Sequence, residues 1–382
     1  MKKKFIFLLL ALTLVSTFIS GCGKKEEASN QNSSVEDVPA PVIVVEDMPA
    51  EVIPEEPVIE EVEEEEPEEV REGFYRSELT HEWIDESLKD LRPIAAMVDN
   101  ELTALPHYGT SQADVVYEMM NSTQNGRVTR LMCIFKDYNS IKQIGSIRSV
   151  RTTNLQIAPE YNAIVVHDGG PLYINAFFKN PFVDHLSGGF SRIDNGKSRE
   201  FTEYITTGEI TKRCESEGID LNYNEYYQGP HWLFAKDSKP TDLSQANNAI
   251  PCTKIKLPYE HNKSKLEYIE ETQTYRYSEY GSEYVDALTN EHMEFTNLIL
   301  QECDFEQLDD HGYMNFFVHQ GDNKKGYFIT KGYAIPIVWA KNEFDMYPTY
   351  FFDEDLNMIQ LNTGKTYVCI VPSDSWSSLV VE

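Results

Sequence analysis

Short apolar runs recur along most of the chain, and their residue types predict strands. The clearest runs in the first half are rich in β-branched residues and are bounded by turn residues, as strands are. Several are continuously apolar, which predicts strands buried on both faces. These strand segments are 94–98, 115–119, 129–135 and 163–166. Helical spacing is weaker and is confined to 152–158, 172–178 and 209–217.

The pattern changes after a connection, residues 223–251, that is rich in Asn, Tyr and Pro. Beyond it, short apolar runs alternate with turn residues, which predicts largely antiparallel β-structure. We therefore place a domain boundary within the connection and expect domains at 73–235 and 236–382. The predicted strands of the second domain are 254–257, 266–277, 298–301, 312–319, 326–330, 334–339, 358–361 and 366–371.

The N-terminus reads as a secretion signal. Met1 and three lysines precede an apolar run from Phe5 to Ile19 that ends in Ser-Gly-Cys22. A basic start, a short apolar core and small residues define a signal peptide, and the run is shorter than the roughly 20 apolar residues of a spanning helix. Ile19-Ser-Gly-Cys22 also fits a lipobox, in which the cysteine is acylated and becomes the mature N-terminus.

We therefore expect Cys22 to carry acyl chains, such as palmitate, that anchor the protein to the outer face of the cell membrane. Two acyl chains hold a protein stably, whereas one anchors it marginally. The alternative is an ordinary signal peptide followed by an incidental cysteine.

Residues 23–72 form an acidic segment with 18 Asp or Glu, three basic residues and scattered prolines. Such a composition cannot bury enough apolar surface to fold, so we expect a disordered tether. It is a spacer or, alternatively, a docking site for a basic partner or cations. The remaining body is also acidic, which argues against nucleic acid as a partner.

The cysteines beyond Cys22 do not form a recognisable framework. Their odd number and wide spacing fit neither a disulfide scaffold nor a zinc motif. Cys133 and Cys369 lie in apolar runs, where a buried thiol is expected. The set is Cys133, Cys214, Cys252, Cys303 and Cys369.

The densest polar cluster in a strand-and-turn context is Gly145-Ser-Ile-Arg-Ser-Val-Arg151. Arg148 and Arg151, beside Ser149 and a predicted helix start at Thr152, suit a carboxylate or phosphate through charge-assisted hydrogen bonds. The alternative is that both arginines pair with acidic residues of the protein itself.

A second candidate segment, His167-Asp-Gly-Gly170, closes a predicted buried strand and opens a turn. His167 and Asp168 are candidate ligand-facing or acid–base residues, and Gly169 and Gly170 shape the turn. Together with Asp184 and His185 they could also assemble a metal or acid–base site. The alternative is a structural histidine bonded to the backbone.

Other motifs do not carry a function. Gly364-Lys-Thr resembles the end of a phosphate loop, but Ile359 stands where the first glycine belongs and a strand is predicted to follow. No cofactor or metal is predicted. Six aromatic residues of the second half could line a glycan groove or fill the core. They are Tyr275, Tyr277, Tyr284, Tyr313, Tyr327 and Trp339.

Several stretches together resemble the YerB-like family of lipoproteins of Gram-positive bacteria, whose function is not defined. The N-terminal part resembles it in Arg92-Pro-Ile-Ala, Ser111-Gln-Ala-Asp-Val-Val-Tyr-Glu118, Arg127-Val-Thr-Arg130, Gly145-Ser-Ile-Arg-Ser-Val-Arg151 and Tyr161-Asn-Ala-Ile-Val-Val-His-Asp-Gly-Gly170. The C-terminal part is similar in Tyr275-Arg276, Asp286, Asn297, Pro336-Ile-Val-Trp-Ala-Lys341, Asn362-Thr-Gly-Lys-Thr366 and Pro372.

The resemblance implies an α+β fold of layered β-sheets with a helical layer, a three-layer β-β-α sandwich. The chain departs from the family at Arg199-Glu-Phe-Thr-Glu-Tyr-Ile-Thr-Thr207, where the family's usual histidine and asparagine are absent. No catalytic residue is carried over from the resemblance.

Two functions remain open. The favoured hypothesis is a non-catalytic module of the cell envelope that binds an anionic, wall-derived ligand or a protein partner through Arg148, Arg151 and the 167–170 segment. The alternative is a cell-envelope hydrolase that uses His167 or Asp168 as acid or base.

Overall fold

The computed structural model describes residues 69–320 and 324–382. The predicted signal peptide, Cys22 and the tether up to residue 68 lie outside the described residues. Within the described ranges, no helix is long and apolar enough to span a membrane.

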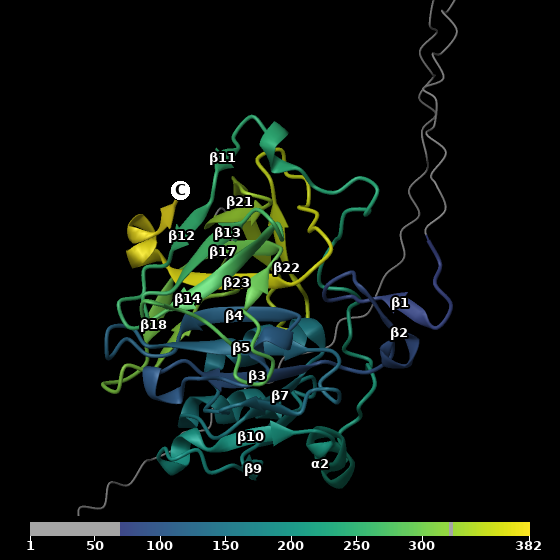
Figure 1. Cartoon of the computed structure of the whole chain (residues 1–382). Coiled ribbons are helices and arrows are strands. Elements are labelled where there is room, and N and C mark those ends of the chain that lie inside the picture. The colour runs from purple at the N-terminus through teal and green to yellow at the C-terminus, as the bar shows by residue number, and fades with distance from the viewer. Residues whose placement is uncertain (1–68, 321–323) are drawn as a thin grey trace, which may run out of the picture. The chain divides into compact units, whose positions relative to one another are not determined.

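One large mixed sheet runs through the protein, and Figure 1 shows four of its strands, β4, β5, β3 and β7, side by side. The four strands predicted in the first half are confirmed as β3, β4, β5 and β7, and their residues are buried, as their continuous apolar character predicts. In sheet order the strands are β11 (Ile250–Pro251), β21 (Tyr333–Lys341), β20 (Lys324–Thr330), β17 (Asn297–Cys303), β23 (Thr366–Pro372), β4 (Val115–Met120), β5 (Thr129–Phe135), β3 (Ile94–Asp99), β7 (Ile164–His167) and β8 (His185–Ser187), and β22 (Thr349–Phe352) pairs with β21.

The large sheet joins the two halves of the sequence. β23 pairs in parallel with β4, so that Thr366 lies opposite Val115, and β23 also pairs in parallel with β17. The predicted boundary between residues 235 and 236 falls in the coil between α2 and β11, and the sheet continues across it. Two separately folding domains therefore stay a prediction.

A second sheet of six strands is wholly antiparallel and belongs to the second half, in agreement with the strand pattern there. Residues 266–277, predicted as one strand, form a hairpin instead, because the chain turns back at 270–273, where Gln273 adopts a positive φ of 54°. Its strands are β15 (Ser282–Glu283), β14 (Thr274–Glu279), β13 (Lys265–Ile269), β12 (Lys254–Lys256), β24 (Val380–Val381) and β16 (Glu294–Phe295).

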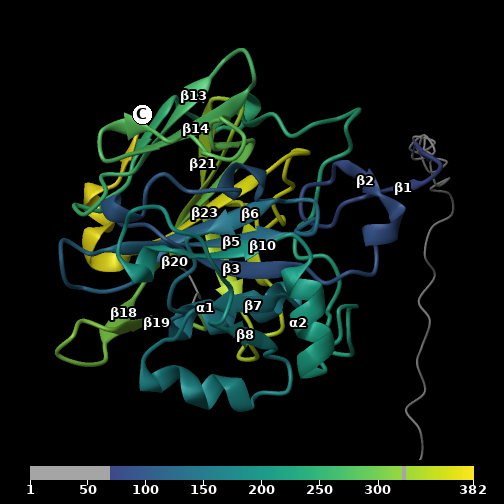
Figure 2. The same ribbon diagram turned by 60° about the horizontal axis from the view of Figure 1, so that its bottom comes forward.

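Smaller elements complete the fold, and Figure 2 brings forward the end that carries α1, β7, β8 and α2. The two α-helices are α1 (Thr152–Ile157) and α2 (Glu209–Glu217). The short strands are β1 (Phe74–Arg76), β2 (Trp83–Asp85), β6 (Gln143–Gly145), β9 (Ser191–Arg192), β10 (Glu203–Thr206), β18 (Phe305–Gln307) and β19 (Met314–Phe316). The 3₁₀ helices are η1 (Glu86–Leu88), η2 (Leu102–Ala104), η3 (Thr110–Gln112), η4 (Ala158–Tyr161), η5 (Leu172–Lys179), η6 (Arg199–Phe201), η7 (Leu243–Gln245) and η8 (Ser373–Ser378).

Three sequence predictions need correction at this level. The segment 172–178 is the 3₁₀ helix η5 rather than an α-helix, and the strand predicted at 312–319 is shortened to β19. Residues 358–361 form no strand; Met358 and Leu361 each make one isolated bridge. Isolated bridges leave the segment without the continuous ladder that defines a strand.

A buried carboxylate, Glu118 on β4, ties the two larger sheets together. Its Oε2 accepts hydrogen bonds from the hydroxyls of Tyr367 (2.6 Å) and Tyr277 (3.0 Å), which lie on β23 and β14. Side chains of Asn262 (2.7 Å), Thr129 (2.9 Å) and Ser264 (3.1 Å) donate to its Oε1. Because successive residues of a strand face opposite sides, neighbouring Tyr117 meets Tyr161 of η4 on the other face, hydroxyl to hydroxyl at 2.8 Å.

Most of the aromatic side chains proposed for a glycan groove or the core, and all the described thiols, are buried in the core. Tyr275, Tyr277, Tyr284 and Trp339 are buried, whereas Tyr313 and Tyr327 are half-buried. The thiols of the five cysteines beyond Cys22 are all free and buried, as expected for Cys133 and Cys369.

A second buried carboxylate, Glu160 of η4, is charge-paired. Its oxygens lie 2.9 Å from Lys341 Nζ on β21 and 2.7 Å from His231 Nε2, and all three side chains are almost wholly inaccessible to solvent. Burial by itself raises the pKa of Glu160, but Lys341 and then His231 outweigh burial and hold that pKa at about 2. The pair therefore fixes the first half of the chain to the second.

We predict that Lys341→Met lowers the free energy of unfolding by about 3–5 kcal/mol, because it leaves Glu160 buried without its main counter-charge. Urea denaturation measures the change. The double variant Glu160→Gln/Lys341→Met should recover more than half of the loss, since no buried charge is then left unpaired. Equal stability of the single variant and the unmodified protein would contradict the role of this pair.

Candidate functional site

The structure brings the two candidate segments, 147–151 and 167–170, side by side. The amide of Asp168 donates to the carbonyl of Arg148 at 2.9 Å, and Val150 donates to Gly169 at 3.1 Å. Gly170 permits this approach, because a Cβ there would lie 2.4 Å from Ile174 Cδ1 and 2.9 Å from the Val150 carbonyl. The side chains that extend from this pair of segments form the candidate site.

Three arginines converge beside these segments, and we call Arg130, Arg148, Arg151, Asp99 and Tyr313 the arginine site. Arg148 forms ion pairs with Asp99 on β3 (2.7 Å) and with Glu200 on η6 (3.1 Å). Its side chain is 22% exposed, whereas Asp99 is fully buried. For Arg148, the alternative of internal pairing is therefore correct.

Arg130 supports the site from within the sheet. It is 3% exposed, it donates from Nη1 to the carbonyl of Ser149 at 2.7 Å, and its Nη2 lies 3.7 Å from Asp99. Its buried Nε has no hydrogen-bond partner among the described residues. Asp99 is thus shared between two guanidinium groups.

Arg151 forms no ion pair with any carboxylate of the described chain. Its Nη1 donates to the neutral Val150 carbonyl at 3.0 Å, and its guanidinium lies 4.8 Å from the centre of the Tyr313 ring. Its Nε is buried without a partner in the described part of the chain. Burial first, and then the charge of Arg130, lower the pKa of Arg151 to about 9. The arginine site therefore holds a half-buried cation that forms no ion pair with an anion of the described residues.

Several polar groups beside the arginines already form hydrogen bonds within the protein. The Ser149 hydroxyl donates to the Asp168 carbonyl at 2.9 Å, and the Thr153 hydroxyl accepts the amide of Phe316 at 3.0 Å. The predicted helix at 152–158 is α1, six residues long, and the side chain of its Asn154 already accepts the amide of Arg151. The Ser149 hydroxyl and the Arg151 amide therefore have no free hydrogen for a ligand, and the charged donors of the site are its guanidinium groups.

His167 is held as a structural residue. Its Nδ1 lies 2.8 Å from the carbonyl of Gly169, so this nitrogen is the donor and Nε2 is the acceptor, 3.1 Å from His185 Nδ1. Burial lowers the pKa of His167 to about 4. The ring is therefore neutral at physiological pH, with both nitrogens engaged, and it forms no hydrogen bond with the Asp168 side chain.

Asp168 instead belongs to an acidic pair that the sequence did not single out. Its carboxylate lies 3.2 Å from Arg192 Nη2, and the same nitrogen contacts the buried carboxylate of Glu203 on β10. Burial, together with the hydrogen bond to Asp168, raises the pKa of Glu203 to about 7. The pKa of Glu203, which lies close to the 167–170 segment, is therefore near neutral pH.

Of the other two residues considered for a metal or acid–base site, His185 lies beside His167, whereas Asp184 is paired elsewhere. Asp184 pairs with Arg92 at 2.6 Å, and His185 contacts His167 and stacks on Phe178. Within the described residues, no group of three or more His, Cys, Asp or Glu side chains could hold a metal ion.

The site residues that the sequence reasoning missed come from elements distant in sequence. Asp99 ends β3, Arg130 lies inside β5, and Tyr313 precedes β19. An arginine within an otherwise apolar strand is a detectable signal for Arg130, because buried arginines are rarely tolerated without a partner. Tyr313 was named only as a residue of a glycan groove or of the core, and its contact with Arg151 could not be predicted from the sequence.

Fold and site together define a β-rich α+β protein that carries a cluster of arginines where two loops meet. The chain belongs to the YerB-like family: the profiles described as "Protein of unknown function (DUF3048)" match it at residues 79–220, for the N-terminal domain, and 255–368, for the C-terminal domain. It is 23% identical over 307 residues to the "Putative lipoprotein YerB" of Bacillus subtilis (strain 168), covering 78% of this chain and 86% of that protein. The crystal structure of the YerB protein from Bacillus subtilis has the same fold, with a TM-score of 0.67 and 21% identity over 81% of this chain and 99% of that one.

We predict effects of different size on stability for the two candidate arginines. Arg151→Met should change the free energy of unfolding by no more than about 1 kcal/mol. The variant loses the contact with Tyr313, but it also removes the cost of burying the guanidinium charge. Arg148→Met should cost about 3 kcal/mol, because it weakens the pairing of the buried Asp99. Urea denaturation of both variants measures this, and equal losses would contradict the unpaired state of Arg151.

Proposed function

We propose that this chain is an extracytoplasmic lipoprotein, anchored to the outer face of the cell membrane through Cys22, whose arginine site binds an anionic ligand without catalysis. The proposal joins two independent supports. One is the lipobox of the sequence together with the lipoprotein named among its relatives. The other is the guanidinium of Arg151, which forms no ion pair with a carboxylate in residues 69–320 and 324–382.

The lipid anchor predicts that Cys22→Ser abolishes both acylation and membrane retention. Cells that express the full chain would be labelled with an alkyne analogue of palmitate and separated into membrane and soluble fractions. The unmodified protein should carry label and sediment with membranes, and the variant should do neither. Cys214→Ser, which removes a buried thiol of the body, is the control that should keep both properties. Label retained in Cys22→Ser would contradict the anchor.

Arg151 carries the argument for an anion. A guanidinium that is desolvated and beside like charges is held in an unfavourable state, as the pKa of about 9 records. A carboxylate or phosphate placed against it would supply the missing counter-charge through charge-assisted hydrogen bonds. Because Arg148 already has Asp99 and Glu200, Arg151 is the residue on which ligand affinity should depend most.

We predict that an anionic wall fragment raises the thermal stability of the full chain in detergent, and that Arg151→Met removes this effect. Polyglycerol phosphate without amino-acid substituents is the probe, because it is anionic and carries no ammonium group. A ligand at about 100 times its dissociation constant should stabilise by about 2.7 kcal/mol. Arg127→Met is the matched control, because Arg127 is also half-buried but pairs with Asp374. A shift that persists in Arg151→Met would overturn the site.

The other outcomes separate the remaining functions. If no probe shifts the unmodified chain, the small-ligand reading fails, and an acidic surface of a protein partner becomes the anion to test. If a probe is consumed, the hydrolase reading gains support with Asp168 and Glu203 as the carboxyl pair, since His167 has both nitrogens engaged. In that case Glu203→Gln should abolish turnover and leave binding intact.

We also propose that the fold is a three-layer β-β-α sandwich. Support comes from β4, where Glu118 contacts the six-stranded sheet through Tyr277 and its neighbour Tyr117 contacts η4 on the opposite face. The side chain of Asn154 on α1 lies against the sulfur atoms of Met119 and Met132, from β4 and β5. These contacts support a helical layer and a second sheet on opposite faces of the large sheet.

A further inference from the structure

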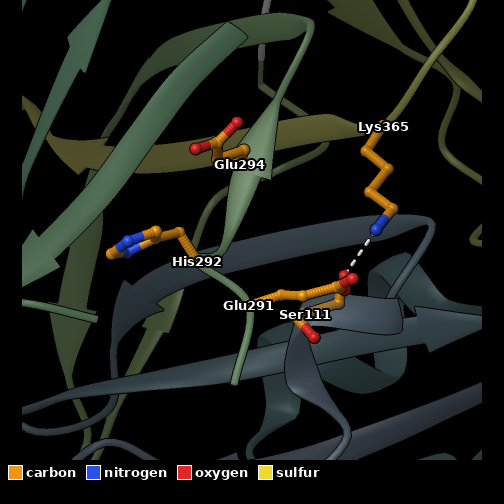
Figure 3. A pocket seen from close by; sticks show the side chains of 5 residues that line it. All are labelled: Ser111, Glu291, His292, Glu294 and Lys365. Atoms are coloured by element: carbon orange, nitrogen blue, oxygen red, sulfur yellow. Dashed lines mark hydrogen bonds between the residues drawn. The ribbon is translucent and has the colours of Figure 1, made fainter. Parts of the chain in front are cut away.

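A polar cavity of about 380 Å³ lies apart from the arginine site and contains none of its residues. Ser111, Glu291, His292, Glu294 and Lys365 line it, and Figure 3 shows Lys365 reaching across it toward Ser111. Ser111 comes from η3 before β4, and Lys365 from the turn before β23, so the cavity sits where the two halves of the chain meet.

Lys365 lies in the turn 362–365, whose other residues are held by hydrogen bonds and close packing. Asn362 exchanges hydrogen bonds with Asn297, and the Thr363 hydroxyl donates to Asp237 at 2.6 Å. Gly364 is required by close packing, since a Cβ there would meet Thr296 Oγ1 at 2.1 Å. These contacts of Asn362, Thr363 and Gly364 stabilise the turn, whereas the Lys365 ammonium extends away from it.

The ammonium of Lys365 has donors to spare. Its Nζ donates to the Ser111 carbonyl at 2.5 Å, and no carboxylate of the described residues forms an ion pair with it. An ammonium group has three donor hydrogens, so two remain for a ligand in the cavity.

The wall opposite Lys365 is rigidly held. The buried carboxylate of Asp286 accepts the amides of Gly109 (3.0 Å) and Ser111 (2.8 Å), which fixes the loop that presents the Ser111 carbonyl. Lys365 is therefore positioned by a contact that does not neutralise its charge.

The carboxylates that line the cavity are not equivalent. Glu294 is neutralised by Arg276 at 2.8 Å and accepts the Thr274 hydroxyl at 2.7 Å. The carboxylate of Glu291 is exposed, and no ion pair or hydrogen bond with it is found in the described part of the chain. The cavity thus offers one uncommitted cation, Lys365, and one uncommitted anion, Glu291.

We propose that this cavity binds a zwitterion of the amino-acid type, with its carboxylate against Lys365 and its ammonium against Glu291. The volume lies at the lower end of the range of small-molecule pockets, which suits an amino acid or a dipeptide. A simple anion would use Lys365 alone and would be repelled by Glu291, whereas a simple amine would be repelled by Lys365. The site is independent of the arginine site and does not rest on its ligand.

The test is isothermal titration of the full chain in detergent with alanyl-alanine, up to about 10 mM, which detects binding at a dissociation constant of about 1 mM. We expect the dipeptide to bind and to do so at least tenfold more tightly than acetate or ethylamine. Lys365→Met should weaken binding about tenfold or more, the loss expected for a charge-assisted hydrogen bond. Glu291→Gln, on the exposed rim, should also weaken it and keeps the test decisive if Lys365→Met unfolds.

Two controls separate this site from others. Lys239→Met, which removes an exposed lysine elsewhere, and Arg151→Met should both leave dipeptide binding unchanged. Binding of acetate as tight as that of the dipeptide, no binding of the dipeptide, or binding unaffected by Glu291→Gln would each overturn the proposal.

Discussion

The buried carboxylate of Glu118 is the constraint on which the arrangement of the two larger sheets depends. A carboxylate without water must be surrounded by donors, because an unpaired buried charge costs several kcal/mol. Here the donors come from both sheets: Tyr367 and Thr129 belong to the large sheet, Tyr277 to the six-stranded sheet, and Asn262 to the loop between its strands β12 and β13. A sliding of one sheet over the other would leave Glu118 without its hydrogen bonds, so the carboxylate selects one register of packing.

The same logic explains how the halves of the chain are joined. β23 completes the large sheet beside β4, and the ion pair of Glu160 with Lys341 fixes η4 to β21. Both family profiles therefore describe parts of one hydrogen-bonded sheet. The cavity beside Lys365 and the arginine site lie on elements that this joining holds in place, and each depends on residues from more than one segment.

Arg148 and Arg151, three residues apart, show how position decides the role of identical side chains. Arg148 meets two carboxylates and stabilises the fold through Asp99, whereas Arg151 meets an aromatic ring and a neutral carbonyl. Glu200, one partner of Arg148, lies on η6, so the balance of charge at the arginine site depends on a segment distant in sequence.

The amino-acid sequence by itself determined the strands of the first half, because continuous β-branched runs leave few other ways to bury so much apolar surface. It also predicted α2 at 209–217, which the structure confirms, and a lipobox at Cys22, which lies outside the described residues. Local pattern could not reveal the hairpin at 270–273, the sharing of Asp99 by two arginines, or the cavity between Ser111 and Lys365. Those features depend on which distant segments meet, and the tertiary structure alone decides whether a given charge finds a partner.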